Sequence, residues 1–143
     1  MSDELVGRLR DIPLFSEVDD EHLRRVAEMA TSFEVGSGFV LIEHGQPGSG
    51  MFVLIDGTIE IELPNRAPIT RGAGAFVGEL SLLTDTPRVA RVRARTAVRG
   101  VAISRAAFWE LLDSEPRVAV GMLPELARRL VESETETRLI ESS

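Results

Sequence analysis

The chain has 143 residues, of which 43% are apolar, and a formal net charge of −7. This is the composition of one globular domain with a sizeable core, and its acidic excess argues against a protein built to hold the nucleic acid backbone. No apolar run approaches the roughly 20 residues that cross a bilayer, residues 1–11 lack the apolar stretch of a secretory signal, and cysteine is absent. We therefore expect a cytoplasmic protein without disulfides, thiolate metal sites or a membrane partner.

The first predicted element is a helix over residues 20–30. Asp19 is placed as its N-cap, because an aspartate side chain can accept a hydrogen bond from a free amide at the start of a helix. The apolar residues of this stretch then fall on one face, which is the spacing of a helix that packs on a core. They are Leu23, Val26, Ala27 and Ala30.

From Phe33 to about Val101 the chain divides into short apolar runs separated by glycine, proline, asparagine and aspartate. Ile59, Ile61 and Leu63 alternate with polar residues, which is the pattern of a strand with one buried face. Many short strands joined by glycine-rich turns are typical of an antiparallel β-roll or a jelly-roll-like barrel. We therefore predict a mainly β domain with flanking helices.

The strand predicted near residues 90–96 carries a second alternation. Its even positions are small or apolar and its odd positions are charged, in the order Ala90, Arg91, Val92, Arg93, Ala94, Arg95. Arg88 has the even, inward parity, and burying an arginine without a partner is costly because it keeps its charge. Either Glu79 neutralises Arg88 as an ordinary buried ion pair, or the anion of a ligand does.

The backbone beside Gly78 favours the ligand. Residues 79–83 are predicted to form a helical turn opened by this glycine, and the free amides of such a turn favour a phosphate. Arg88 can donate two hydrogen bonds to the same phosphate. Glu79, when ionised, only accepts hydrogen bonds and would take one from a sugar hydroxyl. A singly charged phosphate beside a sugar hydroxyl describes a cyclic nucleotide.

Two helices are predicted after the strands. Ser104 can cap a helix that ends near Asp113, and Ser114 can cap a last helix that begins near Pro116. Pro124 lies well inside that last helix, where it removes one backbone hydrogen bond and should kink the helix. Residues 132–143 form a polar tail that is expected to fray.

Two stretches resemble the phosphate-binding cassette of the cyclic nucleotide-binding domain family: Phe-Val-Gly-Glu-Leu at residues 76–80 and Pro-Arg-Val-Ala at residues 87–90. That family includes the catabolite activator protein, the regulatory subunits of protein kinase A and cyclic nucleotide-gated channels. The likeness covers about residues 12–131. It implies one regulatory domain, a β-roll with an N-terminal helix and two C-terminal helices. The residues themselves offer no catalytic constellation and no metal-binding spacing, so we expect no catalytic residues, metal or cofactor.

The resemblance also implies roles for single residues. Glu79 corresponds to the acceptor for the ribose 2′-hydroxyl, and Arg88 to the partner of the exocyclic phosphate oxygens. The main chain that lines the sugar-phosphate corresponds to Gly78, Leu80 and Ala90.

The base preference is predicted to be cyclic AMP over cyclic GMP. In the family a hydroxyl residue directly after the cassette arginine can accept a hydrogen bond from the guanine amino group. Val89 stands at that position and offers no acceptor. The base can also be read from the last helix, where Arg128 and Arg129 are candidate contacts.

The signal is predicted to pass from Leu82 and Leu83 in the cassette to the C-terminal helices, and from there to an unknown effector protein or domain. A homodimer through the last helix is a further expectation, and no nucleic acid contact is expected. Two alternatives stay open. One is a degenerate family member that acts as a protein-interaction module without binding nucleotide, and the other is an enzyme built on the barrel.

Three side chains outside the cassette are given ordinary structural roles. His22 and His44 lack a second ligand at metal-binding spacing, so both are expected to be surface histidines. Trp109 is expected to pack on the roll from its helix rather than to stack on a base.

Overall fold

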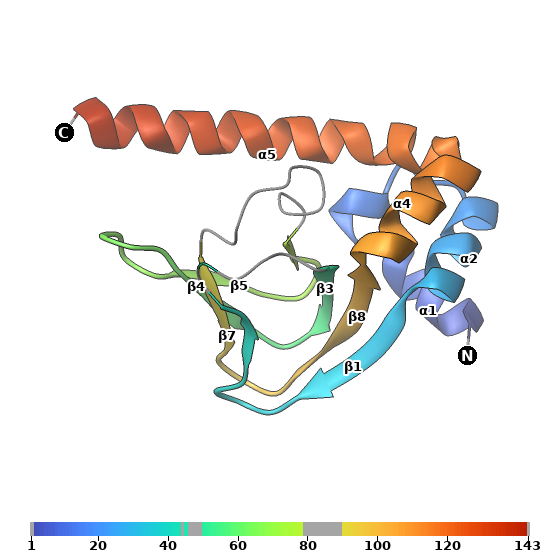
Figure 1. Cartoon of the computed structure of the whole chain (residues 1–143), viewed down its shortest axis with the longest axis horizontal. Coiled ribbons are helices and arrows are strands. Elements are labelled where there is room, and N and C mark those ends of the chain that lie inside the picture. The colour runs from blue at the N-terminus through green and yellow to red at the C-terminus, as the bar shows by residue number, and fades with distance from the viewer. Residues whose placement is uncertain (1, 44, 46–49, 79–89, 143) are drawn as a thin grey trace.

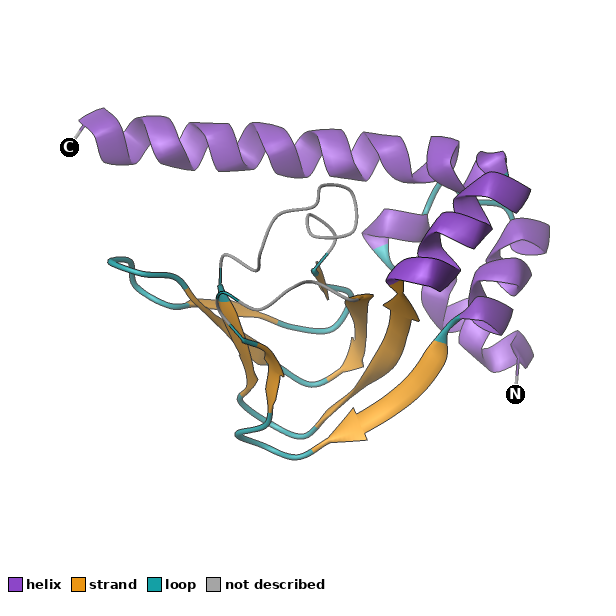
Figure 2. Ribbon diagram, viewed as in Figure 1, coloured by secondary structure: helices purple, strands orange, loops and turns teal. Residues whose placement is uncertain are grey.

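The computed structural model describes residues 2–43, 45, 50–78 and 90–142. Helices gather at one end of a set of strands, and one long helix runs across the molecule (Figures 1 and 2). The helical elements are α1 (Ser2–Arg10), the 3-10 turn η1 (Pro13–Phe15), α2 (Asp20–Met29), α4 (Arg105–Ser114) and α5 (Pro116–Ser142).

The strands form two four-stranded sheets, and every described strand pair is antiparallel. The first sheet has the order β1 (Thr31–Val35), β8 (Val98–Ser104), β3 (Gly50–Asp56) and β6 (Phe76–Val77). The second has the order β2 (Val40–Ile42), β7 (Arg91–Ala94), β4 (Ile59–Glu62) and β5 (Ile69–Arg71). The predicted β-roll with flanking helices is confirmed, although the described strands remain two sheets rather than a closed barrel.

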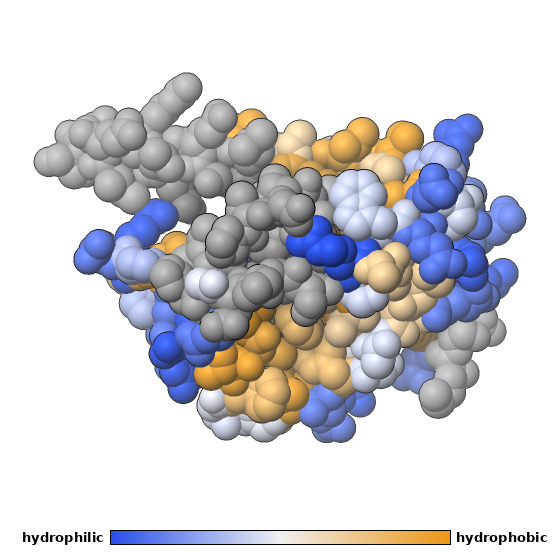
Figure 3. Space-filling model, viewed as in Figure 1, coloured by the Kyte–Doolittle hydropathy of each residue, from blue (hydrophilic) through white to orange (hydrophobic). Residues whose placement is uncertain are grey.

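Two apolar clusters hold these layers together. The larger one joins the helices to the first sheet and contains Leu9, Phe15, Leu23, Met51, Ile103 and Phe108. The smaller one lies within the roll and contains Ile42, Leu54, Ile59, Val77, Val92 and Ala94. Fully burying one large apolar side chain contributes roughly 1.5–3 kcal/mol, so these clusters dominate the stability of the fold. On the face shown in Figure 3, apolar surface also lies along α5.

The N-terminal region holds more structure than the sequence analysis predicts. The helix after Asp19 is confirmed, and the Asp19 side chain caps it by accepting a hydrogen bond from the amide of His22. The prediction of one helix before the strands is incomplete, because α1 and η1 precede α2. Val6 and Leu9 of α1 are buried in the larger cluster, which explains why this short segment docks.

The C-terminal helices confirm some predictions and correct others. Ser104 caps α4 by accepting from the amide of Ala107, as predicted. The predicted cap by Ser114 is wrong, since Ser114 is the last residue of α4 and its hydroxyl donates to the carbonyl of Glu110. Pro124 lies inside α5 as predicted, and α5 extends to Ser142 and so includes most of the predicted polar tail; the kink and the fraying stay predictions.

Candidate functional site

The segment predicted to bind a ligand, residues 78–90, is described at its two ends. Gly78 directly follows β6, and Ala90 directly precedes β7. The remaining predicted contacts lie outside the described residues, so their roles stay predictions. They are Glu79, Leu80, Arg88 and Val89, together with the proposed relay residues Leu82 and Leu83.

The upstream end is held by the first sheet. Phe76 and Val77 are buried and pair with β3. The amide of Leu54 donates to the carbonyl of Ala75 at 2.8 Å, which extends this pairing toward the preceding turn. Gly78 then has a φ of +92°, a backbone conformation that glycine adopts far more readily than other residues. A glycine therefore stands at the one position directly after β6 where the backbone conformation requires it.

The downstream end is held by the second sheet. Ala90 is 9% exposed, and Val92 and Ala94 are buried, so the predicted inward parity is confirmed for these three residues. The amide of Ala94 donates to the carbonyl of Phe39 at 2.8 Å, which fixes the far end of the short strand. Val77, Val92 and Ala94 belong to one buried cluster, so both ends of the segment are anchored on the same apolar core.

The outward arginines of β7 are engaged with glutamates. Arg91 Nε lies 2.8 Å from Oε1 of Glu43, and Arg93 Nε lies 3.2 Å from Oε1 of Glu62. The hydrogen bond and charge of Glu43 raise the pKa of Arg91. The outward orientation of these arginines follows from the strand alternation, whereas their glutamate partners were not predicted. The alternation of charged and apolar residues over 59–62 was the available signal for Glu62.

The next arginine continues this arrangement at the end of β7. Arg95 Nη1 lies 3.5 Å from Oε2 of Glu60 on the neighbouring strand β4. The outward arginines at 91, 93 and 95 are therefore matched by acidic side chains, as expected of a strand face turned to solvent.

Other predicted contacts lie elsewhere in the fold. Arg128, a candidate base contact, donates to Glu125 one turn earlier on α5. Trp109 lies on α4 as predicted, is 47% exposed and touches Phe108 edge to face at a centroid distance of 6.0 Å; its packing on the roll stays a prediction. His22 is not an ordinary surface histidine, because its side chain is 19% exposed and faces two carboxylates. His44 lies outside the described residues.

Within the described part of the chain, no three histidine or acidic side chains gather as they would around a metal ion. None of the described helices, including α5, combines the length and apolar character needed to cross a bilayer.

Comparison with known proteins identifies the family of this fold, and the matched region contains both ends of the predicted binding segment. Residues 33–115, more than half of the chain, match the family model of the cyclic nucleotide-binding domain. The chain belongs to this family. The matched residues include the whole predicted cassette and end at the junction between α4 and α5.

Individual relatives show how this domain is used elsewhere. The chain is 33% identical over 108 residues to a cyclic nucleotide-gated potassium channel from Mesorhizobium japonicum, covering 76% of the chain and 30% of the channel. It is 31% identical over 106 residues to a cAMP-dependent protein kinase regulatory subunit from Emericella nidulans, covering 73% of the chain and 26% of that subunit. The chain thus spans less than a third of either relative's length.

A solved structure supports the same assignment. The cAMP-bound structure of PfPKA-R superposes with a TM-score of 0.79 at 26% identity, covering 94% of this chain and 45% of that one. A TM-score of this size over nearly the whole chain shows that the two sheets and the flanking helices share one arrangement.

Proposed function

We propose that this chain is a regulatory domain that binds cyclic AMP through residues 78–90. The observation that carries the proposal is the family match over 33–115, which contains this segment. Two described features support it: Gly78 has a left-handed φ directly after β6, and the strand residues next to the segment, Val77 and Val92, lie in one apolar cluster. Among the relatives, a kinase regulatory subunit carries cAMP dependence in its name.

In this proposal Arg88 holds the cyclic phosphate and Glu79 accepts from the ribose 2′-hydroxyl. The glutamate partners of Arg91, Arg93 and Arg95 support the choice of Arg88, because those three arginines are already matched by acidic groups on the outer face. Val89 supplies no hydroxyl for the guanine amino group, so cyclic AMP binds more tightly than cyclic GMP.

Calorimetric titration with cyclic AMP, cyclic GMP and linear 5′-AMP tests the proposal. We expect binding in the order cyclic AMP, cyclic GMP, 5′-AMP, and a preference for cyclic GMP would overturn the base assignment. If none of the nucleotides binds, the chain is instead a protein-interaction module. Chromatography of the cyclic AMP after incubation, with and without divalent metal, tests the enzyme alternative, for which ring-opened product is the deciding observation.

The role of Glu79 is tested with 2′-deoxy cyclic AMP. Removing the hydroxyl leaves the Glu79 carboxylate without its proposed donor, and an acceptor that loses its partner in a site closed to water costs about 1–3 kcal/mol of binding free energy. The penalty should be smaller in Glu79→Gln, since a neutral amide loses less when its partner is absent. Equal penalties in the two proteins would remove Glu79 from the sugar site.

We further propose that the output passes through α4 and α5 to an effector or to a second copy of the chain. Phe108 and Leu111 of α4 are buried in the cluster that joins the helices to the first sheet. Val120, Leu123 and Val131 of α5 are between 57% and 62% exposed, which supports pairing of α5 with another helix. Sedimentation equilibrium of the parent and of Leu123→Arg tests the second copy, which predicts a dimer that the charged side chain weakens.

A further inference from the structure

The corner between α4 and α5 is formed by one residue, Glu115. Its amide donates to the carbonyl of Leu111 at 2.8 Å and so closes α4. Its carbonyl accepts from the amide of Val118 at 2.9 Å and so opens α5. Any group that holds the Glu115 side chain therefore holds the place where the two C-terminal helices meet.

His22 on α2 holds that side chain. Its Nε2 lies 3.2 Å from Oε2 of Glu115, and its Nδ1 lies 2.6 Å from Oδ1 of Asp19, the N-cap of α2. Ionised carboxylates only accept hydrogen bonds, and a neutral imidazole has a single N–H to donate. Only the protonated ring can donate to both carboxylates, so this geometry selects the charged form of His22.

The surrounding charges reinforce this selection. The hydrogen bond that the His22 ring donates to Asp19 raises the pKa of His22 above its ordinary 6.5, and the charges of Asp19, Glu115 and Glu21 add to the effect. Two arginines also interact with these carboxylates. Arg25 Nε lies 3.9 Å from Oε1 of Glu115, and the charge of Arg117 at the start of α5 helps to lower the pKa of Asp19.

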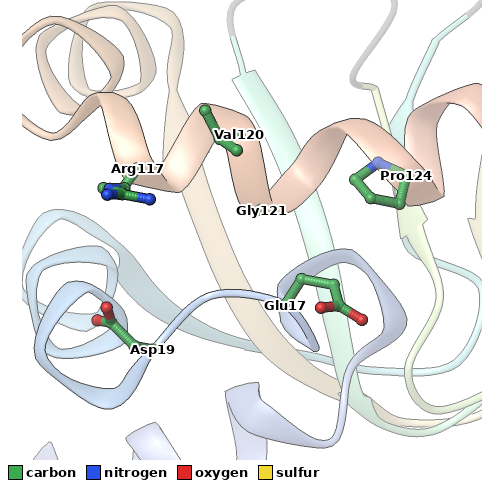
Figure 4. A pocket seen from close by; sticks show the side chains of 6 residues that line it. All are labelled: Glu17, Asp19, Arg117, Val120, Gly121 and Pro124. Atoms are coloured by element: carbon green, nitrogen blue, oxygen red, sulfur yellow. The ribbon is translucent and has the colours of Figure 1, made fainter.

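A second contact joins the same two parts without any titrating group. Gly121 of α5 lies so close to the residues before α2 that a Cβ built on it would be 2.6 Å from Cγ2 of Val18. Figure 4 shows the hollow beside this contact, where Arg117 and Gly121 of α5 lie opposite Asp19 and Glu17. Two contacts thus hold the start of α5 near Asp19. The contact between His22 and Glu115 depends on pH, and the contact between Gly121 and Val18 does not.

We propose that His22 is a pH-dependent latch between the N-terminus of α2 and the corner of α4 and α5. The latch is closed while the ring carries both protons and weakens when one is lost. The pKa is raised in the docked state, so the contribution of His22 is fully present below pH 6.5 and is lost as pH rises through the raised value. The proposal requires no bound nucleotide and stands apart from the proposed function.

The first test is the titration of His22 by NMR. The chain has two histidines, so the spectrum of His22→Gln assigns the ring signals. We expect the His22 midpoint to lie above 6.5 in the parent and to fall in Glu115→Gln. Asp19→Asn should also lower it, and it keeps a side chain that can cap α2. An unchanged midpoint in Glu115→Gln would overturn the latch.

The second test measures the position of α5. Because the chain has no cysteine, Arg24→Cys and Leu123→Cys introduce two spin labels on exposed positions of α2 and α5 without a competing thiol. An excess of unlabelled protein restricts the measured distances to those within one molecule. We expect one narrow distance distribution at pH 6 and a broader or shifted one at pH 9. In the His22→Gln background the distribution should not depend on pH. Identical distributions at both pH values in the labelled parent would overturn the proposal.

Discussion

Gly78 is the last described residue before the undescribed part of the predicted cassette, and its φ of +92° makes the absence of a Cβ at this position testable. Adding a Cβ in a left-handed conformation costs about 1–2 kcal/mol, so Gly78→Ala should destabilise the protein by about that amount in urea denaturation. Gly72→Ala is the matched control, because Gly72 has no left-handed φ and its Cβ would lie at an ordinary 4.0 Å from the carbonyl of Gly57. Equal losses in both variants would show that the left-handed φ of Gly78 does not penalise a side chain at this position.

Arg88 is tested by the affinity for cyclic AMP. Truncating one member of a buried charge pair costs about 2–5 kcal/mol, and about 1.4 kcal/mol corresponds to a tenfold change in affinity. Arg88→Ala should therefore weaken binding by at least tens of fold in calorimetry. Arg95→Ala is the control, since Arg95 is exposed and paired with Glu60 on the outer face. Parental affinity in Arg88→Ala would show that the assignment is wrong.

At the scale of single residues, the parity of a strand was the part of the site that the sequence could predict. Alternation is local, so Ala90, Val92 and Ala94 could be placed inward from their order alone. The partners of His22 could not be found in this way. Glu115 lies far along the chain, and only the packing of α2 against α4 and α5 brings its carboxylate to the ring.

Gly121 provides a test at the scale of the helix. An alanine would normally stabilise a helix by about 1 kcal/mol relative to glycine. At Gly121 the added methyl would meet Val18 and the carbonyl of Glu17, and overpacking of this kind costs about 1–3 kcal/mol. Gly121→Ala should therefore lower the free energy of unfolding in urea.

Two further variants show whether the clash is the cause. Gly7→Ala in α1 should raise the stability, because nothing lies within 4 Å of that position. Val18→Ala should reduce the loss caused by Gly121→Ala, since it removes the nearest atom. If Gly121→Ala is as stabilising as Gly7→Ala, α5 does not rest on Val18 as closely as the structure has it.

Helix starts could be predicted where one capping side chain decides them. Asp19 and Ser104 each accept a hydrogen bond from an amide three residues later, and both were found from residue type and position. Ser114 also carries a hydroxyl, but this hydroxyl donates to the carbonyl of Glu110 within α4. Glu115 then separates Ser114 from the first residue of α5, Pro116. The helix α1 was not predicted because it has few apolar residues. Val6 and Leu9 are buried only through their packing on the larger cluster, which the local sequence does not indicate.

For the whole molecule, the proposed relay predicts where nucleotide binding changes amide exchange. A ligand shifts an equilibrium only through different contacts in its two states. Hydrogen exchange with saturating cyclic AMP should therefore change in residues 104–131 as well as in 76–90. Arg88→Ala, at a nucleotide concentration too low for it to bind, is the control. A change confined to 76–90 would make this domain a binder whose helices do not respond.

The length of α5 gives its contact with Val18 an importance beyond stability. The helix has 27 residues, and Gly121 touches Val18 near its beginning. Since a helix rises about 1.5 Å per residue, the part from Gly121 to Ser142 reaches roughly 30 Å. A tilt of about 10° at Gly121 would move Ser142 by roughly 5 Å, about one helical turn. A small change in the contact between Gly121 and Val18 would therefore produce a much larger displacement at the C-terminal end of α5.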